Sequence, residues 1–122
     1  MIGSQFSTDQ ALIQSNIAIP NIEDVIVAKA TVAGVNSRLA LKIAVCESGL
    51  RQFNEQGGVL RGVHNPDDVG LFQINERYHL TQSQTQDYDI YSTEGNIDYA
   101  LGLLKEEGTR HWRASQACWG TK

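Results

Sequence analysis

A glutamate on the apolar face of a helix is the residue of this sequence with the plainest chemical use. Glu47 lies four residues after Ile43 and eight after Leu39, so the three share one helical face. Burial there and the negative end of the helix dipole both raise the pKa of a carboxyl group. A carboxylic acid that keeps its proton near neutral pH can protonate the leaving oxygen of a glycosidic bond. Periodicity alone also allows Glu47 to turn outward where the helix frays, and both interpretations stay open.

Two short motifs make the sequence resemble a known family. Residues 46–48 read Cys-Glu-Ser, and residues 68–75 read Asp-Val-Gly-Leu-Phe-Gln-Ile-Asn. Together they resemble the lysozyme superfamily, and they are similar both to animal-type lysozymes and to bacterial lytic transglycosylases of the soluble type. In these proteins a Glu-Ser pair ends a buried helix, and a Gly-hydrophobic-hydrophobic-Gln-Ile element follows after a small β region. The resemblance covers residues 38–79 well and continues more weakly through 96–104 and 112–119, and only the pair of motifs is specific.

The resemblance implies roles for two carboxyl groups. Glu47 matches the general acid of the family, and Asp68 matches the second carboxylate of animal-type lysozymes. Asp68 has an alternative role as the N-cap of the helix expected from Gly70 onwards, where it would accept hydrogen bonds from free N–H groups. The predicted catalytic residues are therefore Glu47 and Asp68, with the second role open.

The same resemblance implies a set of substrate-binding residues. Gln73 and Asn75 match residues that line the cleft, where Asn75 would contact a sugar acetamido group. Tyr78 and His79 fall where the lysozymes carry an aromatic pair that packs on sugar rings, and Tyr99 lies in a segment similar to one that borders the transglycosylase site. The alternatives are a structural amide for Gln73, ordinary half-buried side chains for the aromatic pair, and a core position for Tyr99.

The activity that the resemblance implies is cleavage of the glycan strands of peptidoglycan. A lytic transglycosylase would use Glu47 alone and leave a 1,6-anhydro sugar, whereas a hydrolytic lysozyme would also use Asp68. We favour the transglycosylase because of the bacterial character of residues 71–74, although residues 116–120 lack the Ala-Tyr-Asn-Ala-Gly signature common in those enzymes. A non-catalytic glycan-binding relative is the alternative from another class.

Two cysteines, Cys46 and Cys118, are not spaced like a metal knuckle or a redox pair. They are either two unrelated buried thiols or one disulfide that joins the central helix to the C-terminal segment, and we favour the disulfide. The resemblance supports this pairing, because Cys118 falls near the end of a lysozyme disulfide whose partner lies in the catalytic helix. Such a bond suits an extracellular or periplasmic protein.

The elements that must position these residues are mostly helices. We expect a mainly α (α+β), lysozyme-like fold in a single domain over residues 21–122, after a polar lead-in at 1–20. Helix caps and 3.6-residue periodicity predict the long helices, and Gly, Asn and Pro clusters predict the β-hairpin region. The expected elements are helices over 22–33, about 37–48, 70–78 and 94–107, a small irregular β-hairpin region over 52–68, and a last short helix that holds Trp112 and Cys118.

Composition excludes several classes of function. The chain has 122 residues and a net charge of −4, without the basic patch of a nucleic-acid-binding protein. Its longest apolar run, residues 39–46, is too short to cross a membrane, and its three scattered histidines offer no metal-ligand spacing. We therefore expect a monomer that binds peptidoglycan strands without metal or cofactor. Residues 1–15 do not read as a secretory leader, so we expect a secreted mature form that has lost one.

Overall fold

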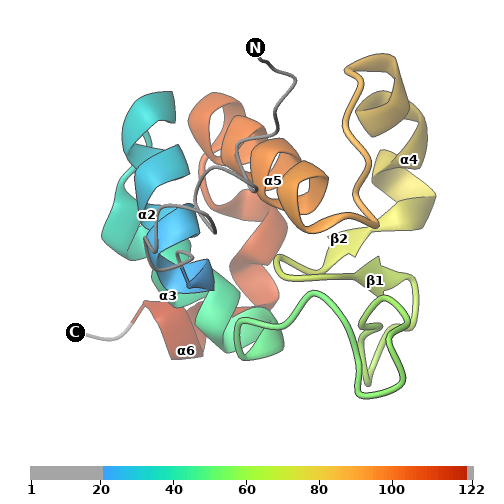
Figure 1. Cartoon of the computed structure of the whole chain (residues 1–122). Coiled ribbons are helices and arrows are strands. Elements are labelled where there is room, and N and C mark those ends of the chain that lie inside the picture. Colours follow the sequence, from blue (N-terminus) through green and yellow to red (C-terminus); the bar gives the residue numbers. More distant parts are fainter. Residues whose placement is uncertain (1–20, 121–122) are drawn as a thin grey trace, which may run out of the picture.

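The computed structural model describes residues 21–120, so the lead-in expected at 1–20 lies outside the described residues. The fold is mainly helical with one two-stranded antiparallel sheet, which confirms the predicted fold class in these general terms (Figure 1). Its elements in chain order are α2 (Ile22–Ala33), α3 (Ser37–Ser48), β1 (Asp68–Val69), β2 (Ile74–Asn75), α4 (Glu76–Thr85), α5 (Thr93–Glu107), the 3-10 helix η1 (Arg110–Ser115) and α6 (Gln116–Trp119).

The three long helices begin and end where the sequence predicts. The side chains of Asn21, Asn36 and Ser92 accept a hydrogen bond from a backbone N–H in the first turn of α2, α3 and α5. At the other end of α3, Gly49 takes the left-handed conformation with φ 65°, and its N–H bonds back to the last carbonyls of the helix. These local signals fix where α3 stops, and therefore place Glu47 in its last turn.

The segment after β1 is where the prediction was wrong. The helix expected over residues 70–78 does not form over 70–75: the backbone turns at Gly70 and Gln73, whose φ values are 78° and 51°, and right-handed helices exclude positive φ. The chain instead makes the β1–β2 hairpin, in which Asp68 pairs with Asn75 and Val69 with Ile74. Helix α4 begins only at Glu76. Residues 52–67 form loops with isolated bridges at Phe53–Val59 and Arg61–Val69.

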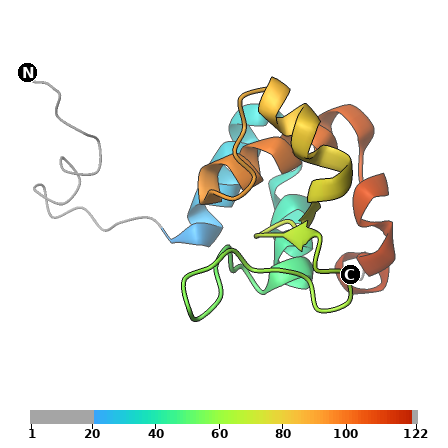
Figure 2. The ribbon, with the colours of Figure 1, turned by 90° about the vertical axis from the view of Figure 1, so that its right-hand side faces the viewer.

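The core lies between the long helices and the hairpin. Figure 1 shows α2, α3 and α5 together on one side, and Figure 2 shows β1 and β2 between α4 and the loop of residues 50–67. Phe72, at the tip of the hairpin, is fully buried and packs edge to face on Trp112 of η1. The hairpin tip therefore inserts into the helical core, and this fixes the position of β1 and β2.

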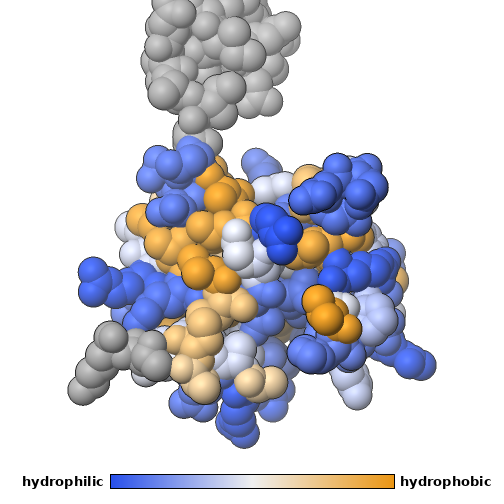
Figure 3. Space-filling model, turned by 90° about the horizontal axis from the view of Figure 1, so that it is seen from below, coloured by the Kyte–Doolittle hydropathy of each residue, from blue (hydrophilic) through white to orange (hydrophobic). Residues whose placement is uncertain are grey.

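Helix α3 is less buried than its composition suggests. Ala40, Ile43 and Ala44 are fully buried, but Val45 is 48% exposed, so the helix is not buried on all sides although residues 39–46 are mostly apolar. The reason is that α3 packs on α2 along one face and on η1 and α6 along another, which leaves a third face open. Large apolar side chains are also exposed on other elements, and one face of the molecule shows apolar patches bordered by polar groups (Figure 3).

A disulfide joins Cys46 of α3 to Cys118 of α6, with 6.0 Å between their Cα atoms, which confirms the pairing that we favoured. It links two segments 72 residues apart in the chain. Because Cys46 precedes Glu47, the bond also holds η1 and α6 beside the candidate acid. Among residues 21–120, no helix is both long enough and apolar enough to span a membrane.

Candidate active site

A pocket of about 260 Å³ opens at the C-terminal end of α3. The hairpin, the start of α4, Leu103 of α5 and η1 complete its walls. It gathers Glu47 and Asp68 together with most of the predicted binding residues, although they come from four different elements. The residues that line it are Glu47, Asp68, Gln73, Ile74, Asn75, Tyr78, His79, Leu103, His111, Trp112 and Ala114.

Glu47 is half-buried in this pocket rather than turned outward at a frayed helix end. Its Oε2 accepts a hydrogen bond of 2.5 Å from the hydroxyl of Ser115 in η1. Burial is the main influence on the carboxyl and raises its pKa; the bond from Ser115 lowers the pKa, and the nearby Asp68 raises it again. The net effect is a raised pKa, in the direction that a proton donor needs.

Asp68 belongs to β1 and faces the same pocket, so it is not the N-cap of a helix. The hairpin register sets it opposite Asn75, whose Nδ2 donates to Asp68 Oδ1 at 3.0 Å. Burial raises the pKa of Asp68, the bond from Asn75 lowers it, and Asp67 raises it. The N-cap interpretation failed because the expected helix does not form, and Asn75 caps the real helix α4 instead.

The two amides predicted for substrate binding both line the pocket, and both also brace the hairpin. Gln73 donates through Nε2 to the carbonyl of Gly70 at 3.1 Å. Asn75 accepts from the backbone N–H groups of Arg77 and Tyr78 while it donates to Asp68. Gln73 therefore braces the hairpin turn itself and does not show the expected alternative, a bridge between the hairpin and the helix. Its position in the pocket leaves the cleft role in place.

Of the predicted aromatic residues, Tyr78 and His79 line the pocket and Tyr99 does not. Tyr78 is 84% exposed, which leaves its ring available for stacking, while His79 is half-buried beside His111. Burial and the neighbouring His111 lower the pKa of His79, which favours a neutral imidazole. Direct substrate binding by Tyr99 was a wrong prediction: the side chain is 1% exposed, and its hydroxyl hydrogen-bonds Nδ1 of His79 at 2.8 Å.

Sequence reasoning missed Ser115, which donates a hydrogen bond to the candidate acid. Besides Glu47, its hydroxyl contacts the carbonyl of Trp112 and accepts from Nε1 of Trp119. No local pattern connects residues so far apart in the chain. The disulfide was the signal that could have found it, because pairing Cys118 with Cys46 sets the preceding turn of η1 beside Glu47.

We expect replacement of Ser115 by Ala to shift the pH dependence of any activity that requires protonated Glu47. The hydroxyl donates to the carboxylate and so favours the charged form; its loss raises the pKa of Glu47 further. The basic limb of the pH–rate profile moves to higher pH, and Ser115→Thr, which keeps a hydroxyl, restores the original limb. An unchanged limb in the Ala variant would show that Ser115 does not act on Glu47.

A pair of buried amides, Asn96 and Gln52, holds the hairpin in place, and no local sequence pattern indicates it. Asn96 of α5 accepts from the N–H of Phe72 and donates to the carbonyls of Val69 and Ile90. Gln52 accepts from the N–H of the residue before Phe72 and donates to the same carbonyl of Ile90. These bonds satisfy the backbone of the turn, where the polar groups are shielded from water.

Gly70 is required at this turn for two reasons. Its φ is 78°, and a Cβ atom there would lie 2.4 Å from Nδ2 of Asn96 and 2.6 Å from Oε1 of Gln52. The glycine of the sequence motif therefore lets two buried amides approach the backbone that carries Asp68 and Gln73. Gly70 therefore helps to position the candidate site residues on the hairpin, although it has no side chain that could react.

We expect Asn96→Leu to lower the free energy of unfolding by roughly 3 kcal/mol, because buried backbone groups of the hairpin lose their partners. Urea denaturation followed by circular dichroism measures the loss. Asn54→Leu is the matched control. Asn54 accepts from two backbone N–H groups in an exposed turn, where water can take its place. We therefore expect this substitution to lower the free energy of unfolding by about 1 kcal/mol or less. Equal effects of the two substitutions would contradict the proposed bracing.

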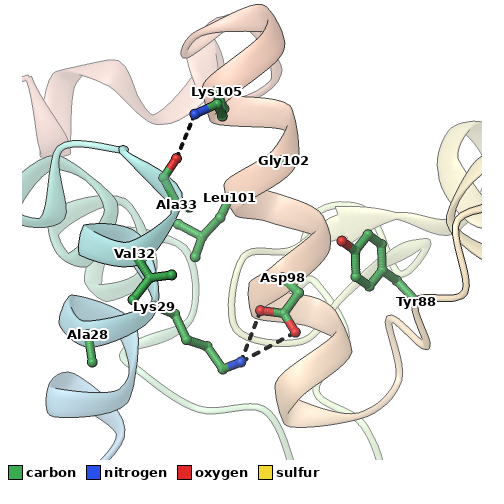
Figure 4. Close-up of a pocket in the computed structure, with 9 residues that line it drawn as sticks. All are labelled: Ala28, Lys29, Val32, Ala33, Tyr88, Asp98, Leu101, Gly102 and Lys105. Atoms are coloured by element: carbon green, nitrogen blue, oxygen red, sulfur yellow. Dashed lines mark hydrogen bonds and ion pairs between the residues drawn. The ribbon is translucent and has the colours of Figure 1, made fainter.

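A second groove, of about 460 Å³, lies between α2 and α5 and is larger than the pocket at Glu47. Figure 4 shows its charged groups engaged with each other or with backbone: Lys29 pairs with Asp98 at 3.1 Å, and Lys105 donates to the carbonyl of Ala33. Neither candidate catalytic carboxyl lies in this groove. The smaller pocket at Glu47 is therefore the candidate active site, although the groove between α2 and α5 has the larger volume.

Two further findings bear on the assignment. Within residues 21–120, no group of three or more His, Cys, Asp or Glu side chains is arranged to hold a metal ion. When the chain is compared with family models, curated proteins and solved structures, none matches. An assignment of function therefore depends on the geometry of the pocket and on the motifs in the sequence.

Proposed function

We propose that this protein cleaves the β-1,4 bond between N-acetylmuramic acid and N-acetylglucosamine in peptidoglycan, with Glu47 as the acid. The observation that carries the proposal is a half-buried carboxyl of raised pKa in an open pocket that also holds Asp68, Gln73 and Asn75. Glycoside cleavage needs a protonated donor at the leaving oxygen, and burial favours the protonated form of Glu47. The amides and the exposed ring of Tyr78 suit acetamido groups and sugar faces.

In the proposed reaction Glu47 gives its proton to the glycosidic oxygen as the bond from that oxygen to C1 of the muramic acid breaks. Positive charge develops on the sugar ring, and Glu47 is left as a carboxylate held by Ser115. The carboxylate then takes the proton of the 6-hydroxyl of the same sugar, and that oxygen forms a bond to C1. The products are a 1,6-anhydro muramyl end and a free 4-hydroxyl, and Glu47 regains its proton.

We favour this lytic transglycosylase over a hydrolase, because it requires one carboxyl group only. Asp68 is half-buried in β1, where the hairpin register pairs it with Asn75. One oxygen of Asp68 is also engaged by Asn75. Asp68 then serves to raise the pKa of Glu47 and to orient the hairpin.

A hydrolytic lysozyme is the second candidate. The observation in its favour is that Asp68 lines the same pocket as Glu47 and acts on it electrostatically. In that mechanism Asp68 would attack or stabilise C1, and water would complete the reaction. The two candidates share the acid and differ in the second carboxyl.

Digestion of purified peptidoglycan followed by mass spectrometry tests the proposal. We expect soluble fragments with 1,6-anhydro ends. Fragments with reducing ends would establish the hydrolase instead. Binding to the wall without release of fragments would support the non-catalytic glycan-binding alternative, and neither binding nor release from several wall types would reject all three.

We expect Asp68→Asn to separate the two mechanisms. In a transglycosylase the variant keeps its anhydro products and loses less than about tenfold in kcat/KM, since asparagine can keep a hydrogen bond to Asn75. The basic limb of the pH–rate profile moves to lower pH, because the charge of Asp68 no longer raises the pKa of Glu47. A loss of a hundredfold or more would make Asp68 a catalytic residue and favour the hydrolase.

With this substrate, we propose that the protein acts outside the cytosol, in the periplasm or the extracellular space. The disulfide between Cys46 and Cys118 supports this location, since such bonds persist in oxidising compartments. The net charge of −4 gives no general electrostatic attraction to an anionic cell wall. We therefore propose that peptidoglycan is bound through local contacts in the pocket.

A further inference from the structure

A second pocket, of about 450 Å³, adjoins the candidate active site along η1. It is lined by Tyr78, His79, Arg110, His111 and Arg113, and we call it the arginine pocket. Tyr78, His79 and His111 also line the pocket of Glu47, so the two spaces meet at these side chains. A substrate held at Glu47 can therefore extend into the arginine pocket without leaving the surface.

The charge of this pocket is opposite to that of the whole molecule. None of the residues that line it is acidic. Glu107 lies beside it and bonds Nε of Arg110 at 2.9 Å and Nε2 of His111 at 2.9 Å. The guanidinium of Arg113 is exposed and makes no hydrogen bond or ion pair with any residue between positions 21 and 120. Two guanidinium groups against one carboxylate leave an excess positive charge, on a chain of net charge −4.

We propose that the arginine pocket is a subsite that binds a carboxylate carried by the muramic acid of the glycan strand, with Arg113 as its main ligand. The inference rests on the proposed function and names the part of the substrate that the arginine pocket binds. A guanidinium group offers two parallel N–H donors that match the two oxygens of a carboxylate. Arg110, oriented by Glu107, supplies further positive charge beside it.

The chemistry of the strand explains why a carboxylate should lie there. Muramic acid carries a lactyl ether, whose carboxyl is either free or joined to a stem peptide that has carboxyl groups of its own. N-acetylglucosamine carries neither, so a chitin strand is neutral. A positive pocket next to the acid therefore discriminates between two polymers that present the same backbone and the same acetamido groups to the cleft.

Arg113→Ala and Arg113→Glu test the subsite in a Glu47→Gln background, which prevents turnover while binding is measured. The probes are a muramic-acid-containing tetrasaccharide with its stem peptides, the same tetrasaccharide after an amidase has removed them, and chitotetraose. Isothermal titration at low salt gives the affinities. Arg38→Ala and Arg38→Glu are the matched controls, since Arg38 is exposed in the first turn of α3 and lines neither pocket.

We expect Arg113→Ala to weaken binding of a carboxylate-bearing tetrasaccharide about tenfold, Arg113→Glu to weaken it more, and chitotetraose to change less than twofold. Salt reduces the difference, as for any exposed charge pair. An effect on the peptide-bearing probe alone assigns the carboxylate to the stem, and an effect after amidase treatment assigns it to the lactyl group. Equal losses on chitotetraose, or no loss beyond that of the Arg38 variants, would overturn the subsite.

The same proteins with Glu47 intact separate this inference from the proposed function. Cleavage of peptidoglycan that Arg113→Glu leaves unchanged would reject the subsite and keep the enzyme. Selective binding of the muramyl probes without any cleavage by the parent chain would reject the enzyme and keep the subsite. No binding of any probe by the parent would reject both.

Discussion

We expect replacement of Glu47 by Gln to abolish the proposed glycan cleavage, with a loss of about a thousandfold or more, and to leave the fold intact. The amide cannot donate the proton that the leaving oxygen needs, and general acid catalysis contributes factors of this order. The amide oxygen can still accept the hydrogen bond that Ser115 gives to the carboxylate. Release of soluble muropeptides from purified peptidoglycan measures the loss, and circular dichroism checks the fold.

Glu47→Asp is the matched control for this substitution. It keeps the acid but shortens the side chain, so we expect partial activity and a weaker contact with Ser115. Near-complete activity of Glu47→Gln would remove Glu47 from the reaction altogether. Equal inactivity of the Asp and Gln variants would show that position matters as much as the proton.

Although Glu47→Gln should abolish activity, we expect it to increase the free energy of unfolding at neutral pH. Since burial raises the pKa of Glu47, the folded chain holds a proton at pH values where the unfolded chain has lost it. Stability from this group is therefore present at acidic pH and lost as the pH rises through the folded pKa. Glu47→Gln should match the parent in urea denaturation below the unfolded pKa and exceed it at neutral pH. A variant less stable than the parent at neutral pH would contradict a desolvated carboxyl.

Removal of the disulfide by Cys46→Ala and Cys118→Ala lowers the free energy of unfolding by about 4 kcal/mol. The bond closes a loop across a sequence separation of 72, and a loop of that length restricts the unfolded chain by about this amount. Urea denaturation of the double variant measures the loss. A thiol reductant should reproduce it in the parent, because Cys118 is exposed.

Two further results would complete this test. The parent should weigh two hydrogens less under non-reducing conditions than after reduction. The reductant should leave the double variant unaffected, which separates loss of the bond from any general effect of the reagent. Two free thiols in the native parent, or a double variant as stable as the parent, would contradict a stabilising disulfide.

The sequence determined the elements whose signals are local. Asn21, Asn36 and Ser92 cap their helices through neighbours three residues away, so a short stretch of chain carries all the information that a cap needs. The stop at Gly49 and the apolar face before it then placed Glu47 at the end of a helix. The pairing of Cys46 with Cys118 was also within reach, because only two cysteines exist.

Tertiary structure decided everything that depends on contacts between distant segments. Residues 70–78 read as a helix, but Asn96 and Gln52 bind the turn at Gly70 from other elements and hold it as a hairpin. That hairpin brings Asp68 into the pocket of Glu47, and no periodicity records the approach of a strand to a helix. Contacts between distant segments also bury Tyr99, which bonds His79 from beneath the pocket surface and does not line the pocket.

Glu47 shows both contributions in one residue. Its place on the helix follows from spacing, which is a property of the local chain. Its raised pKa and its bond to Ser115 depend on how η1 and the hairpin close around it, through the disulfide and the buried amides. Desolvation is a property of the assembled environment, so the raised pKa of this carboxyl could be found only in the folded molecule.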